Sequence, residues 1–354
     1  MIYLRVLLLF FFALAICLII FLSFYLFIRK IWRREYGKWD RMIDMLLRKA
    51  IFFHEGNTGH PALIPVTQRF QANLKNRRFY NRFIKKIIAA KRNVSGQYGD
   101  NLRHLYIQLG LDKKALRLLR SHKWHLKAYA IQQLGTMGLK EHLPRIYRYT
   151  NRKNALVRIE AQIAILNLLG VEGLRFLDVT SYQITDWQQI KLLKELSTVP
   201  QAELTGIDKW LSSGNSSVII FALKLARNYR RYELYENIVS CLDHSEPNVR
   251  KQAISTLTDI YVENTSEVLL ARFDGETYEN QIAIMDAIAV IGDVQNVSAL
   301  FSYLDAGKAQ MKFAVARAIV NGSATGLECL MSDPRSKTYP LTDMIPQLKN
   351  EMKW

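Results

Sequence analysis

The first feature of the hydrophobic pattern is a run of 23 residues without a formal charge, 6–28. A helix rises about 1.5 Å per residue, so this run reaches about 34 Å, enough to cross a hydrocarbon core of roughly 30 Å. The apolar region of a cleaved signal peptide is shorter, about 7 to 15 residues, and ends in small residues that are missing here. A lipoprotein signal is disfavoured because bulky Ile16 precedes Cys17 and the apolar run continues beyond it. The pattern therefore predicts an uncleaved transmembrane anchor, residues 1–30.

After the predicted anchor, apolar residues recur at intervals of three and four, which is typical of one face of a helix. Two tryptophans in this stripe, Trp32 and Trp39, follow the predicted span closely, and we expect both to act as membrane-interface anchors. Glycines and prolines in residues 55–65 predict a loop, after which a further helix is expected. Residues 31–99 are thus predicted to form a helical neck. The two apolar stripes are Trp32, Tyr36, Trp39, Ile43, Leu46, Leu47 and Ala50, and Phe79, Phe83 and Ile87.

From residue 100 onward the apolar pattern repeats with a period of 31 residues, shortened once to 30. The residues four and eight positions after each repeat mark are all apolar, which predicts one amphipathic helix in every unit. The marks are Leu126, Val157, Gln188, Val218, Val249, Asn280 and Met311. The residues four positions later are Ala130, Ala161, Leu192, Ala222, Ala253, Ile284 and Val315. Those eight positions later are Leu134, Ile165, Leu196, Ala226, Leu257, Ile288 and Ile319.

A second apolar column lies twenty residues after the marks and predicts a second helix in each unit. Its members are Ile146, Leu177, Ile207 (in the short unit), Ile238, Leu269, Leu300 and Met331. Turn signals separate the two helices at Gly135, Gly138, Gly170, Pro200, Gly292, Gly322 and Gly326, and Pro247 is expected at a helix start. Helix pairs of this kind bury their apolar faces by stacking.

The predicted fold is therefore all-α, with an N-terminal transmembrane helix followed by an α-solenoid of about seven to eight HEAT-like helix pairs over residues 100–332. Residues 101–121 are expected to form a degenerate first unit. Residues 333–354 are expected to form a C-terminal cap interrupted by Pro334, Pro340 and Pro346.

Two units carry a recognisable motif. The segment from Asn248 to Ile254, with Val249 and Arg250 followed by Ala253 and then Leu257, resembles the short bacterial HEAT repeat of the phycobilisome-lyase type. The segment Val157-Arg158-Ile159-Glu160-Ala161 matches it equally well, whereas Gln189, Ile219 and Gln281 replace the arginine elsewhere. The whole layout is also similar to bacterial inner-membrane-anchored HEAT-repeat proteins, some of them associated with envelope polysaccharide synthesis. This second resemblance implies a scaffold beside a membrane glycosyltransferase.

The charge is concentrated in one part of the chain. The formal net charge is +18, but residues 29–158 carry +23 and residues 159–354 carry −6. Only Arg5 precedes the predicted span, whereas Arg29, Lys30, Arg33 and Arg34 follow it. By the positive-inside rule, we expect a single-pass protein of the plasma (inner) membrane with its N-terminus outside and its repeat domain in the cytoplasm.

The neck is the most basic segment, because no acidic residue lies between Glu55 and Asp100. This pattern predicts a surface that binds anionic membrane lipids or a protein partner, against the alternative of an ordinary solvated helix face. Nucleic acid would use the same residue types, but tethering at a membrane disfavours it as the partner. The candidate residues are Arg33, Arg34, Lys38, Arg41, Arg77, Arg78, Arg82, Lys85, Lys86, Lys91 and Arg92.

The sequence contains no pattern of catalytic or metal-binding residues. The seven histidines and three cysteines show no metal-ligand spacing, and neither a phosphate-binding loop nor a nucleophile elbow occurs. Tyrosines in residues 229–261 alternate with arginines, but neighbouring glutamates favour packing over nucleic-acid binding. We therefore expect a non-enzymatic scaffold without cofactors that binds a protein partner. The alternatives are a lyase-like enzyme or chromophore-handling protein, and nucleic-acid binding through the neck.

Overall fold

The computed structural model describes residues 2–53, 63–197, 204–292, 297–305 and 308–351. Every regular element within these ranges is an α-helix or a 3-10 helix, which confirms the prediction of an all-α chain. The contacts divide the chain into two compact units, Met1–Leu143 and Pro144–Trp354. The predicted boundary between neck and repeats, at residue 100, falls inside a helix of the first unit.

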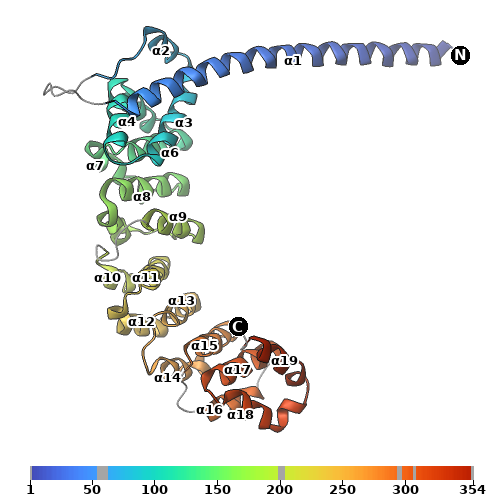
Figure 1. Ribbon diagram of the computed structural model, residues 1–354, viewed down its shortest axis with the longest axis vertical. Coiled ribbons are helices and arrows are strands. Elements are labelled where there is room, and N and C mark those ends of the chain that lie inside the picture. Colours follow the sequence, from blue (N-terminus) through green and yellow to red (C-terminus); the bar gives the residue numbers. More distant parts are fainter. Residues whose placement is uncertain (1, 54–62, 198–203, 293–296, 306–307, 352–354) are drawn as a thin grey trace. The chain divides into compact units, whose positions relative to one another are not determined.

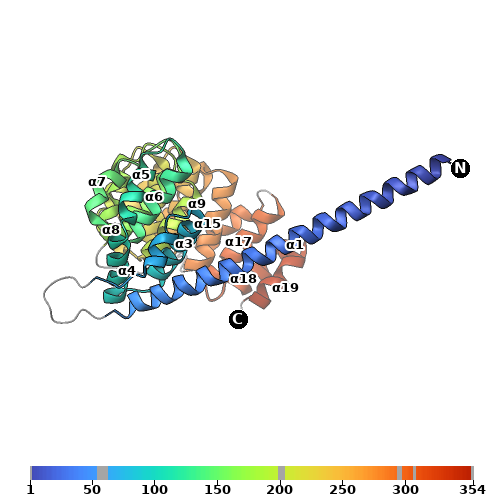
Figure 2. The same ribbon diagram turned by 90° about the horizontal axis from the view of Figure 1, so that it is seen from above.

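The first unit is built around α1, a single helix of 50 residues from Ile2 to Ile51. Its side chains from Phe10 to Arg34 are exposed. This part of α1 extends beyond the other helices of the first unit (Figure 1, Figure 2). Its last part packs against α3 and α4, where Ile43 and Ala50 are fully buried. Within the described residues, α1 is the one helix long and apolar enough to cross a membrane. The other helices of this unit are α2 (Gln68–Asn73), α3 (Arg77–Asn93), α4 (Gly96–Gln108), α5 (Leu111–Leu119), α6 (Trp124–Thr136) and η1 (Lys140–His142).

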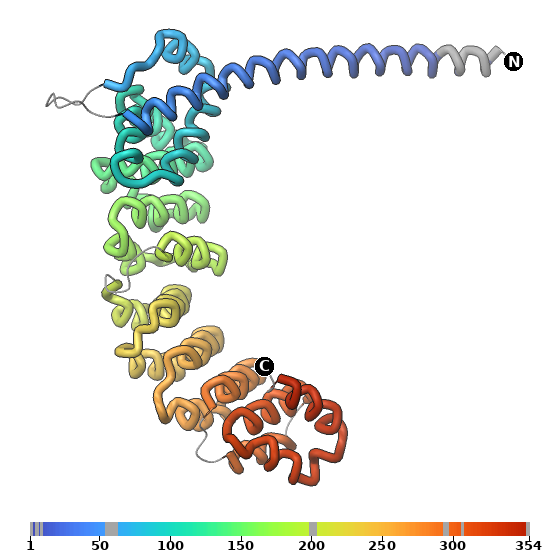
Figure 3. The backbone as a smooth tube through the Cα atoms, in the orientation of Figure 1, coloured from blue at the N-terminus to red at the C-terminus, as the bar shows by residue number. Residues whose placement is uncertain are grey.

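The second unit is a stack of helix pairs that follow one another in chain order (Figure 1, Figure 3). The first helices are α8 (Ala155–Leu169), α9 (Asp186–Leu196), α11 (Ser216–Asn228), α13 (Pro247–Leu257), α15 (Tyr278–Ile291) and α17 (Ala309–Gly322). The second members are η2 (Gly170–Val179), α10 (Ile207–Leu211), α12 (Tyr235–Ser240), α14 (Thr265–Leu270), α16 (Val297–Leu300) and α18 (Gly326–Ser332). The remaining elements are α7 (Leu143–Tyr147), which begins at the boundary, η4 (Tyr232–Leu234), η5 (Cys241–Asp243), η6 (Phe273–Gly275), η7 (Phe301–Leu304), η8 (Pro334–Lys337) and α19 (Leu341–Glu351).

The 31-residue period of the sequence matches the spacing of the first helices. Each of the seven marks is the third residue of a helix, from Leu126 in α6 to Met311 in α17. All fourteen residues of the two columns that follow the marks are at most 1% exposed. Small side chains in the first column, such as Ala222 and Ala253, let neighbouring helices approach closely. The all-α helical-repeat architecture is thus a direct consequence of the apolar spacing.

The second helices are short. α10 has five residues and α16 has four, and in one unit the whole element is the 3-10 helix η2. The prediction for Met331 is wrong: Met331 is 46% exposed, and Leu330, one residue earlier, is fully buried. The turn after α17 sets α18 so that Leu330 faces the core.

The turn predictions are confirmed at some positions and wrong at others. Gly170 and Gly292 end α8 and α15 with positive φ angles of 64° and 70°, a conformation that glycine adopts without strain. Pro247 is the first residue of α13, as expected. Gly135 lies inside α6 and Gly322 is the last residue of α17. Pro200 and most of the predicted loop 55–65 lie outside the described residues.

The C-terminal segment is more regular than its prolines predicted. Pro346 lies inside α19 and does not end that helix. A proline removes one backbone donor, yet α19 is kept in place because Leu341 and Leu348 are buried against the repeats. Pro334 begins the short helix η8, where its missing N–H has no effect on hydrogen bonding.

We expect Gly326→Ala to lower the free energy of unfolding of the second unit by about 1 to 3 kcal/mol, the usual range for overpacking. A Cβ at this position would overlap the carbonyl oxygen of Ile319 and lie 2.9 Å from its carbonyl carbon, so backbone would have to move. Gly214→Ala is the matched control, because a Cβ there meets nothing within 4 Å. Urea unfolding of the detergent-solubilised chain measures both variants, and equal midpoints would contradict the close approach at Gly326.

Candidate functional site

The basic surface predicted in the neck is partly neutralised by the fold. Two acidic residues of α1 lie against α3: Arg82 Nε donates to Asp40 Oδ1 at 2.6 Å, and Lys86 Nζ lies 3.0 Å from Asp40 and 2.7 Å from Asp44. Asp40 lies 42 positions before Arg82, outside the acid-free segment 56–99. The composition of that segment therefore does not reveal these pairs. Arg82 and Lys86 therefore hold α3 against α1 and are not part of a free basic surface.

We expect Asp40→Asn to lower the free energy of unfolding by about 1 to 2 kcal/mol, between the values for exposed and for buried ion pairs. The hydrogen bond from Arg82, with help from Lys86, holds the pKa of Asp40 at about 2, below its ordinary 3.8, although burial alone would raise it. Because the folded-state pKa is depressed, this stabilisation is complete above pH 3.8 and is lost as the pH falls towards 2.

Urea unfolding at several pH values measures this effect, with Asp100→Asn as the control because Asp100 is exposed and lies 3.6 Å from Arg103. The difference between wild type and Asp40→Asn should shrink in acid, whereas Asp100→Asn should match wild type. A pH-independent difference would contradict the pairing of Asp40.

Of the other candidate cations, Lys91 is also withdrawn from the surface. Its side chain lies over Gly99, where an added Cβ would meet the ammonium group, and burial lowers the pKa of Lys91. The remaining candidates are exposed, and one of them, Lys38, lies 4.0 Å from Glu35 of its own helix. These are Arg33, Arg34, Lys38, Arg41, Arg77, Arg78, Lys85 and Arg92.

The two tryptophans predicted as interface anchors have different environments. Trp39 is 6% exposed and packs edge-on against Phe79, with 5.6 Å between ring centroids. It is a core residue, and the prediction that it contacts the membrane surface is wrong, because its helical stripe is covered by α3. Trp32 is 38% exposed, and the Arg78 guanidinium lies 4.3 Å from its ring centroid. Trp32 remains available at the end of the apolar run.

The motif arginines of the repeats have a structural role. Arg158 Nη1 donates to the carbonyl oxygens of Arg152 and Lys153, at 2.7 and 3.3 Å. Arg250 Nη1 makes the equivalent bonds to His244 and Ser245, at 2.8 and 3.1 Å. In both units the arginine thus holds the turn that leads into its own helix. Where glutamine replaces the arginine it also reaches back to a carbonyl, Gln189 to Ile184 and Gln281 to Phe273, each at 3.0 Å.

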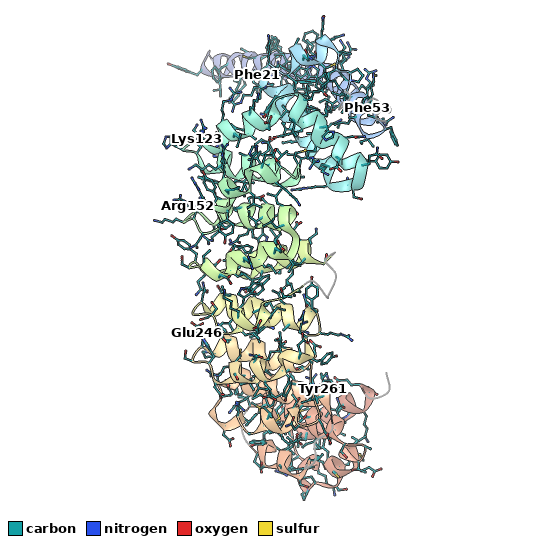
Figure 4. The ribbon with its side chains drawn as sticks, turned by 90° about the vertical axis from the view of Figure 1, so that its left-hand side faces the viewer. Phe21, Phe53, Lys123, Arg152, Glu246 and Tyr261 are labelled. Carbon is teal, nitrogen blue, oxygen red and sulfur yellow. The ribbon has the colours of Figure 1, made fainter. Side chains whose placement is uncertain are left out.

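The tyrosine and arginine cluster in residues 227–261 is mainly structural. Tyr229 donates to the carbonyl of Leu196 at 2.6 Å, and Tyr235 shares a hydrogen bond of 3.0 Å with Thr265. Arg227 pairs with Asp259, and Arg231 pairs with Glu233. Tyr232 and Tyr261 are exposed, and Tyr261 lies at the edge of the second unit opposite Glu246 (Figure 4). These contacts support packing as the role of this cluster.

An exposed apolar patch on neighbouring first helices was missed at the level of sequence. It consists of Leu156 on α8 and of Trp187 and Ile190 on α9, which are 45%, 52% and 63% exposed. Lys191 Nζ lies 3.8 Å from the Trp187 ring centroid. We call Leu156, Trp187, Ile190 and Lys191 the repeat patch. A signal for it existed: Leu156 and Trp187 occupy the column just before the marks, which later units fill with polar residues, Asn248, Glu279 and Gln310.

A polar groove of about 460 Å³ lies between the turns of three successive units, on the edge that carries Glu246 (Figure 4). Its polar groups bind one another. Asn215 donates to the carbonyls of Thr180 and Tyr182 at 3.1 and 3.2 Å, and Ser216 donates to Glu246 at 2.6 Å. These bonds tie adjoining repeats together. Among the described residues, no group of three or more His, Cys, Asp or Glu side chains is arranged to hold a metal ion.

No protein-family model matches the chain, and no curated protein matches it in sequence. Among solved structures it is similar to Kap121p bound to Pho4p, with a TM-score of 0.31, 14% identity and coverage of 83% of this chain and 36% of Kap121p. This chain therefore spans about a third of the length of Kap121p.

Two further structures match over most of their own length. The complex of CpcE and CpcF of phycocyanin lyase from Nostoc sp. PCC7120 has a TM-score of 0.25 and 13% identity, with coverage of 85% of this chain and 98% of that chain. A tumor overexpressed gene (TOG) domain array of a microtubule polymerase has a TM-score of 0.24 and 12% identity, with coverage of 90% and 87%. Similarities of this size assign neither family nor function, and the repeat architecture rests on the helix register described above.

Proposed function

We propose that this protein is a membrane-anchored helical-repeat scaffold whose second unit binds a protein partner on the cytoplasmic side. The observation that carries the proposal is the division of α1 into two parts. From Phe10 to Ile31 its large apolar side chains are exposed, whereas Trp39 and Ile43 of the same helix are buried in the first unit. An apolar surface of this length is unfavourable in water and favourable in a bilayer.

The continuity of α1 supports an anchor that stays attached to the folded unit. The apolar run passes without a break into the segment that packs against α3 and α4. Arg29, Lys30, Arg33 and Arg34 follow the run, which supports an orientation with the folded units in the cytoplasm.

The repeat patch supports protein binding by the second unit. Stacked helix pairs present long exposed surfaces, and exposed aromatic residues with apolar neighbours are the usual anchors of protein interfaces. Trp187 is an exposed aromatic residue of this kind, with exposed Ile190 three positions later on α9 and exposed Leu156 on α8. A membrane glycosyltransferase, which the resemblance implied, is one partner that this proposal admits. The chemistry of the patch specifies only an apolar anchor site.

We expect Trp187→Ala to weaken partner binding at least tenfold, since loss of an aromatic anchor typically costs about 2 kcal/mol or more. Crosslinking in native membranes, followed by quantification of the captured partner, measures this loss. Val290→Ala is the matched control, because Val290 is also an exposed apolar residue on a first helix and lies outside the patch. Equal capture by the two variants would contradict the assignment of the repeat patch.

A further inference from the structure

The helices α1 and α3 run in the same direction. Their contacts advance together along both helices: Arg78 lies 4.3 Å from the ring of Trp32, Arg82 bonds to Asp40, and Lys86 reaches Asp44. The N-terminus of α3 therefore points towards the apolar end of α1.

The level of α3 relative to that apolar end follows from the same contacts. The exposed apolar run ends at Ile31, and Trp32 is the next residue. Because the Arg78 guanidinium rests on the Trp32 ring, the first turn of α3 lies where the apolar part of α1 stops. The polar headgroup layer is roughly 5 to 8 Å thick on each side of a bilayer, so Arg77 and Arg78 lie at its depth if α1 spans the membrane.

Four arginines lie at this level, two on each helix: Arg33 and Arg34 on α1, and Arg77 and Arg78 on α3. We call them the exit face. All four are exposed, and none has an ion pair with a carboxylate in the part of the chain that the structure describes. Farther along α3, Arg82 and Lys86 pair with carboxylates of α1, whereas Lys85 and Arg92 are exposed. The exit face therefore carries free positive charge at the apolar end of the bundle.

The position of Arg77 and Arg78 on their helix is unfavourable without an external anion. They occupy the first turn of α3, which has no acidic residue, and the Asn76 side chain caps the N–H groups of Arg78 and Phe79. A cation near a helix N-terminus is repelled by the helix dipole by about 0.3 to 1 kcal/mol. A negative charge outside the protein would offset this repulsion.

We propose that the exit face binds the phosphate groups of anionic phospholipids, so that the first unit rests against the membrane surface beside its own anchor. This inference rests on the proposed membrane anchoring. The ion pairs of Asp40 and Asp44 with α3 keep the exit face at the depth of the headgroups. Arginine suits the task because its planar guanidinium donates two parallel hydrogen bonds to phosphate.

Amide hydrogen exchange of the full chain in lipid nanodiscs tests this proposal. The discs contain phosphatidylcholine alone or with phosphatidylglycerol, and the readout is the exchange rate of the first two turns of α3. We expect slower exchange in the discs with phosphatidylglycerol and loss of this difference at high salt. Arg77→Gln combined with Arg78→Gln should reduce the lipid-dependent protection about 30-fold, which corresponds to about 1 kcal/mol for each cation near the surface.

The matched control is Lys85→Gln combined with Arg92→Gln, which removes two exposed charges from the same helix but farther from its first turn. This variant should keep most of the protection, and an equal loss would overturn the assignment to the exit face. If the arginine variant proves unfolded, the lipid and salt dependence of wild type still decides the question.

Two other results would overturn the proposal. Equal exchange in both kinds of disc would exclude binding of anionic headgroups while leaving the anchor intact, whereas failure of the chain to enter any disc would contradict the anchor itself. Protection that arises only after an acidic peptide or a DNA oligonucleotide is added would assign the exit face to an acidic macromolecule instead of lipid.

Discussion

Glu276→Ala should lower the free energy of unfolding of the second unit by about 3 to 5 kcal/mol, the range for breaking a buried ion pair. The Glu276 side chain is 5% exposed and accepts two hydrogen bonds from Arg250, at 2.6 and 3.0 Å, and one from Asn280 at 2.8 Å. Its loss leaves the Arg250 guanidinium, 15% exposed, without a counter-charge. Because Arg250 also holds the turn at His244 and Ser245, the start of α13 should loosen as well.

Glu279→Ala is the control for this prediction. Glu279 lies three residues farther along and pairs with Lys251 at 3.2 Å, but its side chain is 78% exposed, so we expect a loss of at most about 1 kcal/mol. Urea unfolding of the detergent-solubilised chain compares the two variants. Similar losses for both would contradict the burial of the Arg250–Glu276 pair.

The pH dependence provides a second test of the same pair. Burial alone would raise the pKa of Glu276, but hydrogen bonds from Arg250 and Asn280 outweigh it and hold the pKa below the ordinary 4.5. A depressed carboxyl pKa contributes stability above the unfolded value of 4.5, and this contribution is lost as the pH falls through the folded value. The difference between wild type and Glu276→Ala should therefore narrow in acid.

Deletion of residues 2–28 should move the chain from the membrane to the soluble fraction. Each Leu, Ile, Phe or Val near the centre of a span favours insertion by about 0.3 to 0.6 kcal/mol, and this run consists mainly of such residues. We expect the wild-type chain to resist extraction by alkaline carbonate and to require detergent. Fractionation followed by immunodetection measures both chains.

A replacement of the same segment by polyleucine of equal length is the control for this deletion, and it should restore membrane attachment. The intact mass of the purified wild-type chain gives an independent check. Wild-type protein that carbonate releases, or a mature chain that begins after the apolar run, would contradict an uncleaved anchor.

The repeat fold was predictable because its determinants are local and periodic. A helix shows its buried face at intervals of three and four, and stacking imposes the same interval on every unit, so Ala222 and Leu257 could be assigned to the core from spacing alone. Features that depend on one particular turn were less predictable. Met331 and Leu330 are both apolar and adjacent, and only the geometry of the turn before α18 decides which one is buried.

The candidate site was less predictable because it depends on contacts between segments distant in the chain. Arg82 and Lys86 belong to a basic run in the sequence, but folding brings Asp40 and Asp44 against them. Tryptophan is a residue type that is common at membrane interfaces, but Trp39 is buried because α3 covers it with Phe79. The repeat patch was overlooked for the opposite reason, since Trp187 and Ile190 fit a helical pattern equally well whether they face the core or the solvent.

The most direct test of a cytoplasmic, membrane-anchored scaffold uses the protein's own cysteines to locate the second unit relative to the membrane. Cys329 on α18 is exposed, whereas Cys241 is buried and its thiol has a pKa raised to about 11 by that burial. With Cys17 replaced by serine, a membrane-impermeant maleimide should label the chain at Cys329 alone. We expect no labelling of Cys329 in intact cells and full labelling after permeabilisation. Labelling of Cys329 in intact cells would contradict a cytoplasmic, membrane-anchored scaffold.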